Sequence, residues 1–325
     1  MSNFRRRLMM SIKKEEKYTQ LEYIEKNGFT QYINTGLIPQ PEWTYEFDFE
    51  RTGKFSYLCG SDISWDSGAF NISIDLSSSG GVSGVGLRTL NFGKIYVSSN
   101  LTPKINERLI IKKTPNQFII GTNTYNINIG NIKAEYPLVI FTTNRNGQPQ
   151  IAEAWVQQYR LYRFSIKNAN EELIMNLLPC LDKNGTPCMY DTISKQAFYN
   201  QGTGEFLYKE KSLFNTANLQ IGYAISASGV VNANKNFNCT EFIPVNQSKY
   251  IFYGISGKKS DWNLRIHAYD ENKNWIKQIL LQPISVGKTL DVNFEINDET
   301  IKYIRASIAN ENFTDYSHIT LKEIS

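Results

Sequence analysis

The sequence is poor in metal-binding residues and in long apolar runs. It contains two histidines, and none of its four cysteines forms a C-x-x-C pair. Zinc sites need three or four such side chains at short spacings, so we expect no metal site and no cofactor. No apolar run reaches the ~18 residues that a membrane-spanning helix needs. The sequence therefore predicts neither a metal centre nor insertion into a membrane.

A secretory signal is also lacking. After Arg7, only Leu8, Met9 and Met10 precede the next polar residues. A signal peptide needs an apolar stretch of about 7–15 residues. We therefore expect no signal-directed secretion.

The cysteines leave two interpretations open. Cys180 and Cys188 are close enough in sequence to bridge a hairpin, while Cys59 and Cys239 have no neighbour of their kind. The alternative is that all four are reduced thiols that pack as small apolar side chains.

The excess of positive charge is confined to the N-terminus. The chain has 35 basic and 31 acidic residues, a net charge of +4. The first 17 residues hold six basic and two acidic side chains, so this segment alone carries +4. The rest of the chain is neutral. A neutral body offers no general attraction to nucleic acid or to an anionic membrane, and neither partner is expected.

Strand patterns dominate what the sequence does contain. It has 19 Tyr and 18 Phe, and aromatic residues favour strands. Polar and apolar residues alternate along Thr44–Glu50 and Asn71–Leu76, and segments rich in Gly, Asn and Pro separate such runs. This pattern is typical of an antiparallel sandwich or barrel. No sustained helical stripe occurs, and Glu171–Leu178 fits a short helix or a strand equally well.

The predicted fold is all-β, with two antiparallel β-sandwich (jelly-roll) modules in tandem after a short basic N-terminal tail. The tail covers residues 1–17, the first module 18–208, a charged linker 209–214 and the second module 215–325. The strands expected in the second module are Tyr250–Ile255, Leu264–Tyr269, Trp275–Leu281, Leu290–Ile296, Ile301–Ala309 and His318–Ile324.

Motifs at both ends of the first module carry a resemblance. Near its start stands Gln31-Tyr-Ile-Asn-Thr-Gly36, a "QYI-x-TG" signature. Near its end come a Pro-Cys turn at 179–185, a Tyr-Asp pair at 190–191, a Phe-Tyr pair at 198–199 and a "G-x-G-x-F" run at 202–206. The module resembles the concanavalin A-like (laminin G-like) domains of tailed-phage and gut-bacterial proteins. That resemblance implies a β-sandwich fold.

The second module and the tail carry looser resemblances. Phe242–Val245, Tyr250–Tyr253, Ala268–Ile276 and Lys302–Ala306 are similar to the carbohydrate-binding-like jelly rolls of phage fibre and baseplate proteins. The first ten residues resemble an N-terminus that recurs on unrelated virion proteins of phages infecting gut Bacteroides, including crAss-like phages. This implies a peptide that docks different modules onto one particle.

The composition of the tail suits such docking. Its candidate contact residues are Phe4, Arg5, Arg6, Arg7, Leu8, Met9 and Met10. Arginines beside bulky apolar side chains can engage an acidic groove on another virion protein. The alternatives are a solvated segment without a partner and a transient nucleic-acid contact.

The segment Glu46-Phe-Asp-Phe-Glu50 is the candidate for catalysis. A strand places Glu46, Asp48 and Glu50 on one face. This E-x-D-x-E pattern resembles the catalytic strand of laminarinase- and lichenase-type glycoside hydrolases. The resemblance would make Glu46 the nucleophile, Asp48 a modulator and Glu50 the acid/base of a retaining mechanism. The alternative is a polar outer face above an aromatic core, and a shared fold does not carry function with it.

Aromatic residues are the candidates for glycan binding. A sugar site needs an exposed ring beside polar side chains that bind the hydroxyls. The candidates are Trp262, Tyr269, Trp275, Asp261 and Arg265 in the second module and Trp65 in the first. The alternative is that these rings belong to the core or to a subunit interface. Asp270, Asn272 and Asn274 superficially match a calcium loop, but Trp275 stands where that loop needs Gly, so a plain turn is expected.

The resemblances imply a non-enzymatic bacteriophage structural protein on the outer surface of the virion. We expect a capsid decoration or head fibre that adheres to host or mucus glycans, made in the bacterial host cytoplasm. A tail fibre or baseplate receptor-binding protein is an alternative, as are a purely architectural subunit and a glycoside hydrolase that uses Glu46 and Glu50. The expected partners are capsid or tail subunits, bound through the N-terminal peptide, and further copies of the chain in a dimer or trimer.

Overall fold

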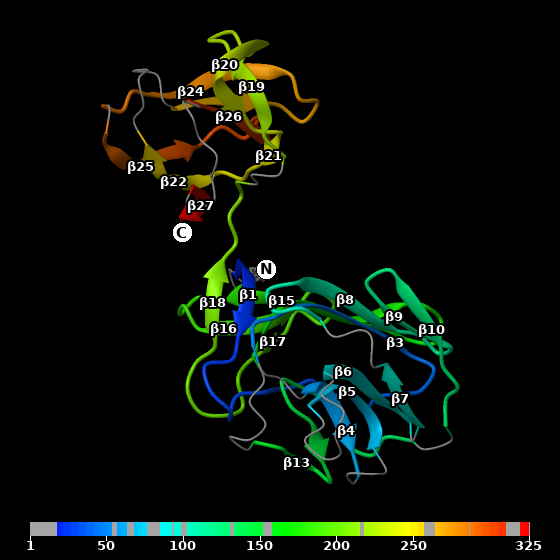
Figure 1. Cartoon of the computed structure of the whole chain (residues 1–325). Helices are drawn as coiled ribbons and strands as arrows, with labels where there is room; N and C mark the ends of the chain where they lie inside the picture. The colour runs from blue at the N-terminus through cyan, green and yellow to red at the C-terminus, as the bar shows by residue number, and fades with distance from the viewer. Residues whose placement is uncertain are drawn as a thin grey trace, which may run out of the picture. The chain divides into compact units, whose positions relative to one another are not determined.

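The computed structural model describes residues 18–53, 57–63, 68–76, 85–92, 94–98, 103–130, 133–151, 158–214, 218–256, 264–285, 287–309 and 319–324. Within these ranges no α-helix occurs and antiparallel strands dominate, which confirms the predicted all-β fold. No described segment forms a helix of the length and apolarity that crossing a membrane requires. The chain divides into two compact units between Glu210 and Lys211 (Figure 1).

The first unit is built on two sheets, drawn as two layers in Figure 1. In order across the larger sheet, the strands are β10 (Asn123–Asn126), β9 (Gln117–Ile120), β8 (Arg108–Lys113), β3 (Thr44–Arg51), β14 (Tyr159–Lys167), β1 (Thr19–Glu25), β15 (Leu173–Leu181), β16 (Pro187–Asp191) and β17 (Ala197–Phe198). A further strand, β18 (Leu207–Glu210), pairs with β1. Glu171–Leu178, which fitted a helix or a strand, thus lies largely in strand β15.

The smaller sheet has the order β13 (Gln148–Pro149), β12 (Asn144–Arg145), β4 (Tyr57–Asp62), β5 (Gly68–Leu76), β6 (Val85–Asn91) and β7 (Lys94–Ser98). Two short strands, β2 (Ile33–Asn34) and β11 (Val139–Ile140), pair with each other, and β11 also pairs with β4. The pairing of β12 with β4 is parallel.

An aromatic core joins the two sheets of the first unit. Tyr45 on β3 and Phe70 on β5 have ring centres 4.5 Å apart, so the sheets pack face to face. Phe47 and Phe164, on adjacent strands, lie 4.4 Å apart and are fully buried. The inward face of β3 is therefore part of a sandwich core.

The second unit also contains two sheets. The first has the order β19 (Gln220–Ile225), β20 (Val231–Cys239), β26 (Tyr303–Ala309), β23 (Leu264–Tyr269) and β24 (Trp275–Gln282), with β21 (Ile243–Pro244) beside β26. The second has the order β25 (Thr289–Ile296), β22 (Ser248–Ser256) and β27 (Thr320–Ile324). Ile266 and Ile304 from one sheet and Phe252 from the other share one buried cluster, separate from the core of the first unit.

Two local features bear on the sequence expectations. Lys209 of β18 pairs with Tyr23 of β1, so strand pairing reaches into the start of the segment 209–214. Near its end, Leu213 donates a backbone hydrogen bond to Leu321 of the second unit. Cys180 lies opposite Cys188 in the β15–β16 pair, and both are buried thiols. Burial and the neighbouring Cys180 raise the pKa of the Cys188 thiol to about 12.

Candidate functional site

The alternation along β3 separates an apolar face from an acidic one. Phe47 and Phe49 are fully buried in the core, as is Tyr45. Glu46, Asp48 and Glu50 alternate with them and are partly exposed on the outer face of the larger sheet. The expectation that the three carboxylates share one face is therefore confirmed.

Basic side chains from neighbouring strands meet these carboxylates. Arg108 on β8 donates two hydrogen bonds to Asp48, of 2.8 and 2.7 Å. Arg160 on β14 lies 2.7 Å from Glu50, and Arg163 lies 3.7 Å from Glu46. Each carboxylate of the E-x-D-x-E segment therefore has an arginine partner.

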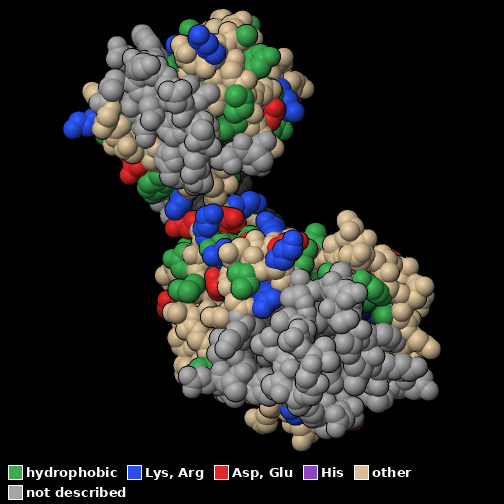
Figure 2. Space-filling view, viewed as in Figure 1, with side chains coloured by type: hydrophobic (Ala, Val, Ile, Leu, Met, Phe, Trp, Pro, Cys, Tyr) green, Lys and Arg blue, Asp and Glu red, His purple; other side chains and the backbone are tan. Residues whose placement is uncertain are grey.

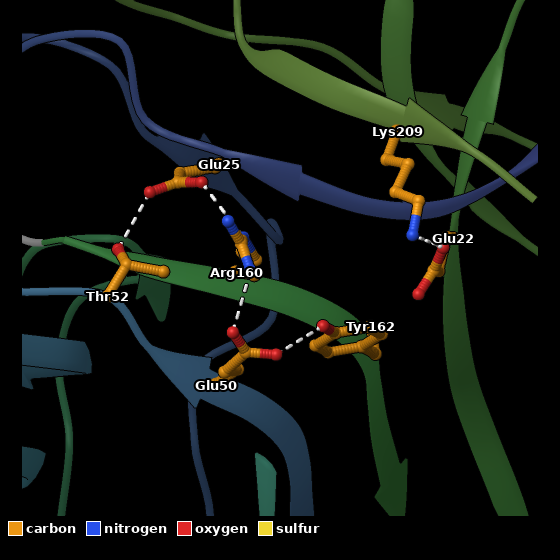
Figure 3. A network of polar contacts seen from close by, with 7 residues as sticks. All are labelled: Glu22, Glu25, Glu50, Thr52, Arg160, Tyr162 and Lys209. Carbon is orange, nitrogen blue, oxygen red and sulfur yellow. Dashed lines mark hydrogen bonds and ion pairs between the residues drawn. The ribbon is translucent and has the colours of Figure 1, made fainter. Parts of the chain in front are cut away.

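Arg160 extends this arrangement to β1, as Figure 3 shows. Its Nε lies 3.2 Å from Glu25, while its Nη1 binds Glu50. Thr52 donates a 2.7 Å hydrogen bond to the other oxygen of Glu25. We refer to Glu25, Asp48, Glu50, Arg108, Arg160 and Tyr162 as the outer-face network. It ties β1, β3, β8 and β14 together.

A β-bulge brings Tyr162 into the outer-face network. The register of β14 against β3 shifts between Leu161 and Arg163, which allows Tyr162 and Arg163 both to face outward. The Tyr162 hydroxyl donates a 2.7 Å hydrogen bond to Glu50, and Arg108 lies over its ring. Burial, followed by the bond to Glu50, raises the pKa of Tyr162.

Hydrogen bonds within the sheet bind both oxygens of two of the three carboxylates, Asp48 and Glu50. A glycosidase nucleophile needs a carboxylate oxygen free to attack, and its acid/base must exchange a proton with the leaving group. Glu46, at the position of the nucleophile, lies 3.7 Å from Arg163. Both oxygens of Asp48 are bound by Arg108, and those of Glu50, at the position of the acid/base, are bound by Arg160 and Tyr162. Charge-assisted bonds of this kind are short and hold a carboxylate in one position. This geometry favours the interpretation of the segment as a polar outer face.

Positive and negative side chains are interspersed elsewhere on this unit too. In the space-filling view, Lys and Arg lie among Asp and Glu on the surface near β1 and β18 (Figure 2). Glu22 and Lys209 form one such pair, at 2.9 Å. This surface therefore has no strong field of one sign, in keeping with the neutral composition of the modules.

The structure separates the aromatic candidates for sugar binding. Trp65, Asp261 and Trp262 lie outside the described residues. Tyr269 is 3% exposed and packs edge-on against Phe242 at 4.9 Å, so its ring belongs to the interior. Of the two interpretations that the sequence left open for this ring, its burial favours the core, because the ring is covered by its own unit.

Trp275 is the candidate ring that the described structure leaves open, with 40% of its surface exposed. Its Nε1 donates a 3.3 Å hydrogen bond to Nδ1 of His267. A Cβ added to Gly229 would lie 2.1 Å from the Trp275 ring, so the ring packs on that glycine backbone. Arg265, another of the candidates, donates a hydrogen bond to the backbone oxygen of Ile225 at 3.3 Å.

The loop after β23 is a plain turn, as the sequence predicts. Oδ1 of Asp270 accepts hydrogen bonds from the backbone amides of Asn272 and Asn274, at 2.9 and 2.8 Å. Its Oδ2 accepts a further bond from the Asn274 side chain. Among the described residues, no three His, Cys, Asp or Glu side chains are grouped so that they can hold a metal ion.

The two signature segments of the first unit contact each other. The buried side chain of Gln31 donates to the backbone oxygen of Glu205 and accepts from the amide of Asn27, both at 2.5 Å. The amide of Gln201 donates to Tyr32, at 2.9 Å. The "QYI-x-TG" and "G-x-G-x-F" motifs thus have a structural role, because hydrogen bonds between them hold the two segments together.

Three buried bases were not identified from the sequence. Lys26 is 5% exposed and Lys113 is fully buried, and burial lowers the pKa of each to about 7. The amine of Lys113 donates to the backbone oxygens of Pro41 and Trp43. His267 is fully buried, and burial, followed by the nearby Arg265 and Arg305, lowers its pKa to about 4. Their spacing carries no signal, because Lys26 and Lys113 stand among other polar residues at the ends of strand patterns and His267 stands alone within one.

The N-terminal peptide 1–17, with its candidate docking residues, lies outside the described residues. Neither the protein-family models nor the curated proteins give a match to this chain.

Proposed function

We propose that this chain is a non-enzymatic structural protein of a tailed-phage virion. Its two sandwich units would be displayed on the outer surface of the particle as a capsid decoration or head fibre. Their task would be weak adhesion to host-surface or mucus glycans. Many copies per particle make weak single sites sufficient, because linked binding events add avidity.

The pairing of the outer-face carboxylates is the observation that carries the non-enzymatic part. The carboxylate oxygens of Asp48 and Glu50 accept hydrogen bonds from Arg108, Arg160 and Tyr162. These bonds support a role for the two residues in stabilising the sheet. The virion part rests on the resemblance of the tail and of the two modules to phage proteins. A tail fibre or baseplate receptor-binding protein would use the same surfaces at another place on the particle.

The test is incorporation into particles. Phages carrying the wild-type gene are compared with phages whose protein lacks residues 2–17, and purified virions are analysed by mass spectrometry and antibody labelling. We expect the wild-type protein on the particle surface and loss of the truncated protein from particles, although it still folds. A matched control replaces Lys13 and Lys14 by Ala and leaves Arg5, Arg6 and Arg7 in place. Wild-type particles that lack the protein would contradict the proposal.

A second assay addresses catalysis. The purified full chain is incubated with bacterial and mucin polysaccharides, and released reducing ends are measured. We expect none above background for the wild type. Release that is lost in Glu50→Gln would replace the proposal by the hydrolase alternative.

A further inference from the structure

The first unit contains an open pocket that is separate from the outer-face network. Its volume is about 510 Å³, within the range of roughly 300–1,000 Å³ typical of small-molecule sites. One side is formed by β2 and the residues after it, and the other by β15, β16 and β17. The two sheets of the sandwich thus both contribute, at the β17 edge of the larger sheet.

The walls of this pocket are held in place by the chain itself. The amide and hydroxyl of Thr35 both donate to the backbone oxygen of Leu138, at 3.0 and 2.8 Å. The amide of Leu37 donates to the Thr35 hydroxyl at 3.2 Å. On the other side, Gln201 is tied to Tyr32 through the backbone. A site that is already ordered loses little entropy when a ligand binds.

The lining combines apolar and amide groups. Leu37, Ile174 and Phe198 are partly buried and pack on the core of the unit. Three exposed side chains of the lining end in carboxamides: Asn34, Gln196 and Gln201. A carboxamide both donates and accepts hydrogen bonds. Apolar contact next to such groups suits a ligand with an apolar face and several hydroxyls.

Charge plays little part in the lining. Among the described residues that line the pocket, Asp191 alone is ionisable in the ordinary pH range. Its Oδ1 accepts from the amides of Asn176 and Ile193, at 2.8 and 3.1 Å. Its Oδ2 accepts from the amide and hydroxyl of Ser194, at 3.1 and 2.6 Å.

These four hydrogen bonds occupy both oxygens of the Asp191 carboxylate. Burial raises the pKa of Asp191, but the bonds from Ser194 and from the two amides outweigh it and hold the pKa below its ordinary value. The group is therefore ionised and already solvated by the protein. A cationic ligand would have to displace these bonds, and an anionic ligand would meet a negative charge with no lining cation to offset it.

We infer that this pocket binds one neutral sugar unit of a glycan. The sugar ring would pack its C–H face on Phe198 and the neighbouring apolar side chains, and its hydroxyls would bind Asn34, Gln196 and Gln201. This inference rests on the proposed adhesive function, to which it adds a site and a ligand class. It places glycan binding on the first unit, away from Trp275.

The test uses the full chain and saturation-transfer NMR with the methyl glycosides of glucose, galactose and N-acetylglucosamine. Methyl glucuronide serves as the charged probe. Gln196→Trp places a bulky ring at an exposed position of the lining, and Gln148→Trp makes the same change at an exposed residue of β13 that does not line the pocket. Thermal melts of each variant verify folding.

We expect at least one neutral glycoside to bind the wild type. The same glycoside should bind Gln196→Trp at least tenfold more weakly and Gln148→Trp with unchanged affinity. Gln201→Ala removes only an exposed carboxamide and should weaken binding at least threefold, which gives an independent result if Gln196→Trp fails to fold. The glucuronide should bind at least tenfold more weakly than the glucoside.

Three outcomes would overturn the inference. Binding that is unchanged in both pocket variants would assign the sugar to another surface and leave adhesion intact. Preference for the glucuronide would show that the ligand is anionic. Absence of neutral glycoside binding to the wild type would remove the site, while incorporation into particles would still decide the virion role separately.

Discussion

Arg108 and Tyr162 form a stacked pair on the outer face of the first unit, with the guanidinium carbon 3.8 Å from the centre of the ring. The same guanidinium donates two hydrogen bonds to Asp48. One side chain thus covers an aromatic face and neutralises a carboxylate. Its removal should affect stability more than the loss of an ordinary surface charge.

The first prediction concerns this pair. We expect Arg108→Ala to lower the free energy of unfolding by about 1–2 kcal/mol, because charged hydrogen bonds and cation–π contact are lost together. Urea denaturation with Asp48→Ala and the double variant should give a coupling energy near 1 kcal/mol. Lys167→Ala, which breaks an exposed pair with Glu171, is the control and should cost less than about 0.5 kcal/mol. A coupling energy of zero would refute a stabilising role.

The second prediction concerns Gln31. Gln31→Glu keeps the shape of the side chain but replaces the donor to Glu205 by an oxygen. We expect a loss of about 2–3 kcal/mol in the free energy of unfolding, because two acceptors then face each other in a buried place. Gln201→Glu, at an exposed position, is the matched control and should change stability little. Similar unfolding curves for the two variants would show that Gln31 does not join the motifs energetically.

The third prediction concerns the pH dependence that Lys113 brings. In the folded chain its pKa is about 7, against 10.5 for the unfolded amine. Between these values the unfolded chain binds more protons, so stability rises with pH, by about 1.4 kcal/mol per pH unit for one such group. Lys26 acts in the same direction. We expect urea midpoints to rise between about pH 7.5 and 8.5.

A variant pair isolates that effect. Lys113→Met should reduce the slope of stability against pH by about 1 kcal/mol per pH unit, because one of the two buried amines is gone. Lys112→Met changes the partly exposed neighbour on the same strand and should leave the slope unchanged. Equal slopes in the wild type and in Lys113→Met would mean that this amine stays protonated in the folded chain.

The fourth prediction concerns His267. Its pKa is lowered from 6.5 to about 4, so between these values the unfolded chain binds the extra proton and stability falls as the pH falls. From about pH 6.5 to 5 we expect a loss of up to about 2 kcal/mol, which His267→Gln should abolish. NMR titration of the two imidazoles gives a direct measurement, with His318→Gln to assign them. An ordinary pKa for His267 would contradict its buried, neutral state.

Much of the strand pattern could be predicted from the sequence. Leu264–Tyr269 is identical in prediction and structure, and Thr44–Glu50 differs from β3 by one residue. Both contain strong alternation of polar and apolar side chains, which reports burial directly. Val231–Cys239 was missed, because it is rich in Asn and most of its side chains are exposed. Such a strand is stabilised mainly by pairing with the neighbouring strands, and its own side-chain pattern does not indicate it.

The candidate site could be predicted only in part. The side of β3 that carries Glu46, Asp48 and Glu50 follows from the period of two. Their partners do not, because Arg108 and Arg160 lie more than fifty residues away in the sequence and meet β3 through strand order and register. A bulge within β14 then decides that Tyr162 also reaches Glu50.

The sequence by itself determined the all-β class, the outward direction of the β3 carboxylates and the confinement of net charge to residues 1–17. These properties depend on local periodicity and composition. The tertiary structure decided which cation meets each carboxylate, that Tyr269 is buried while Trp275 is open, and that Asn34 and Gln196 line one pocket. Such relationships depend on strands that are distant in sequence, and a shift of one residue in register would turn every side chain to the opposite face.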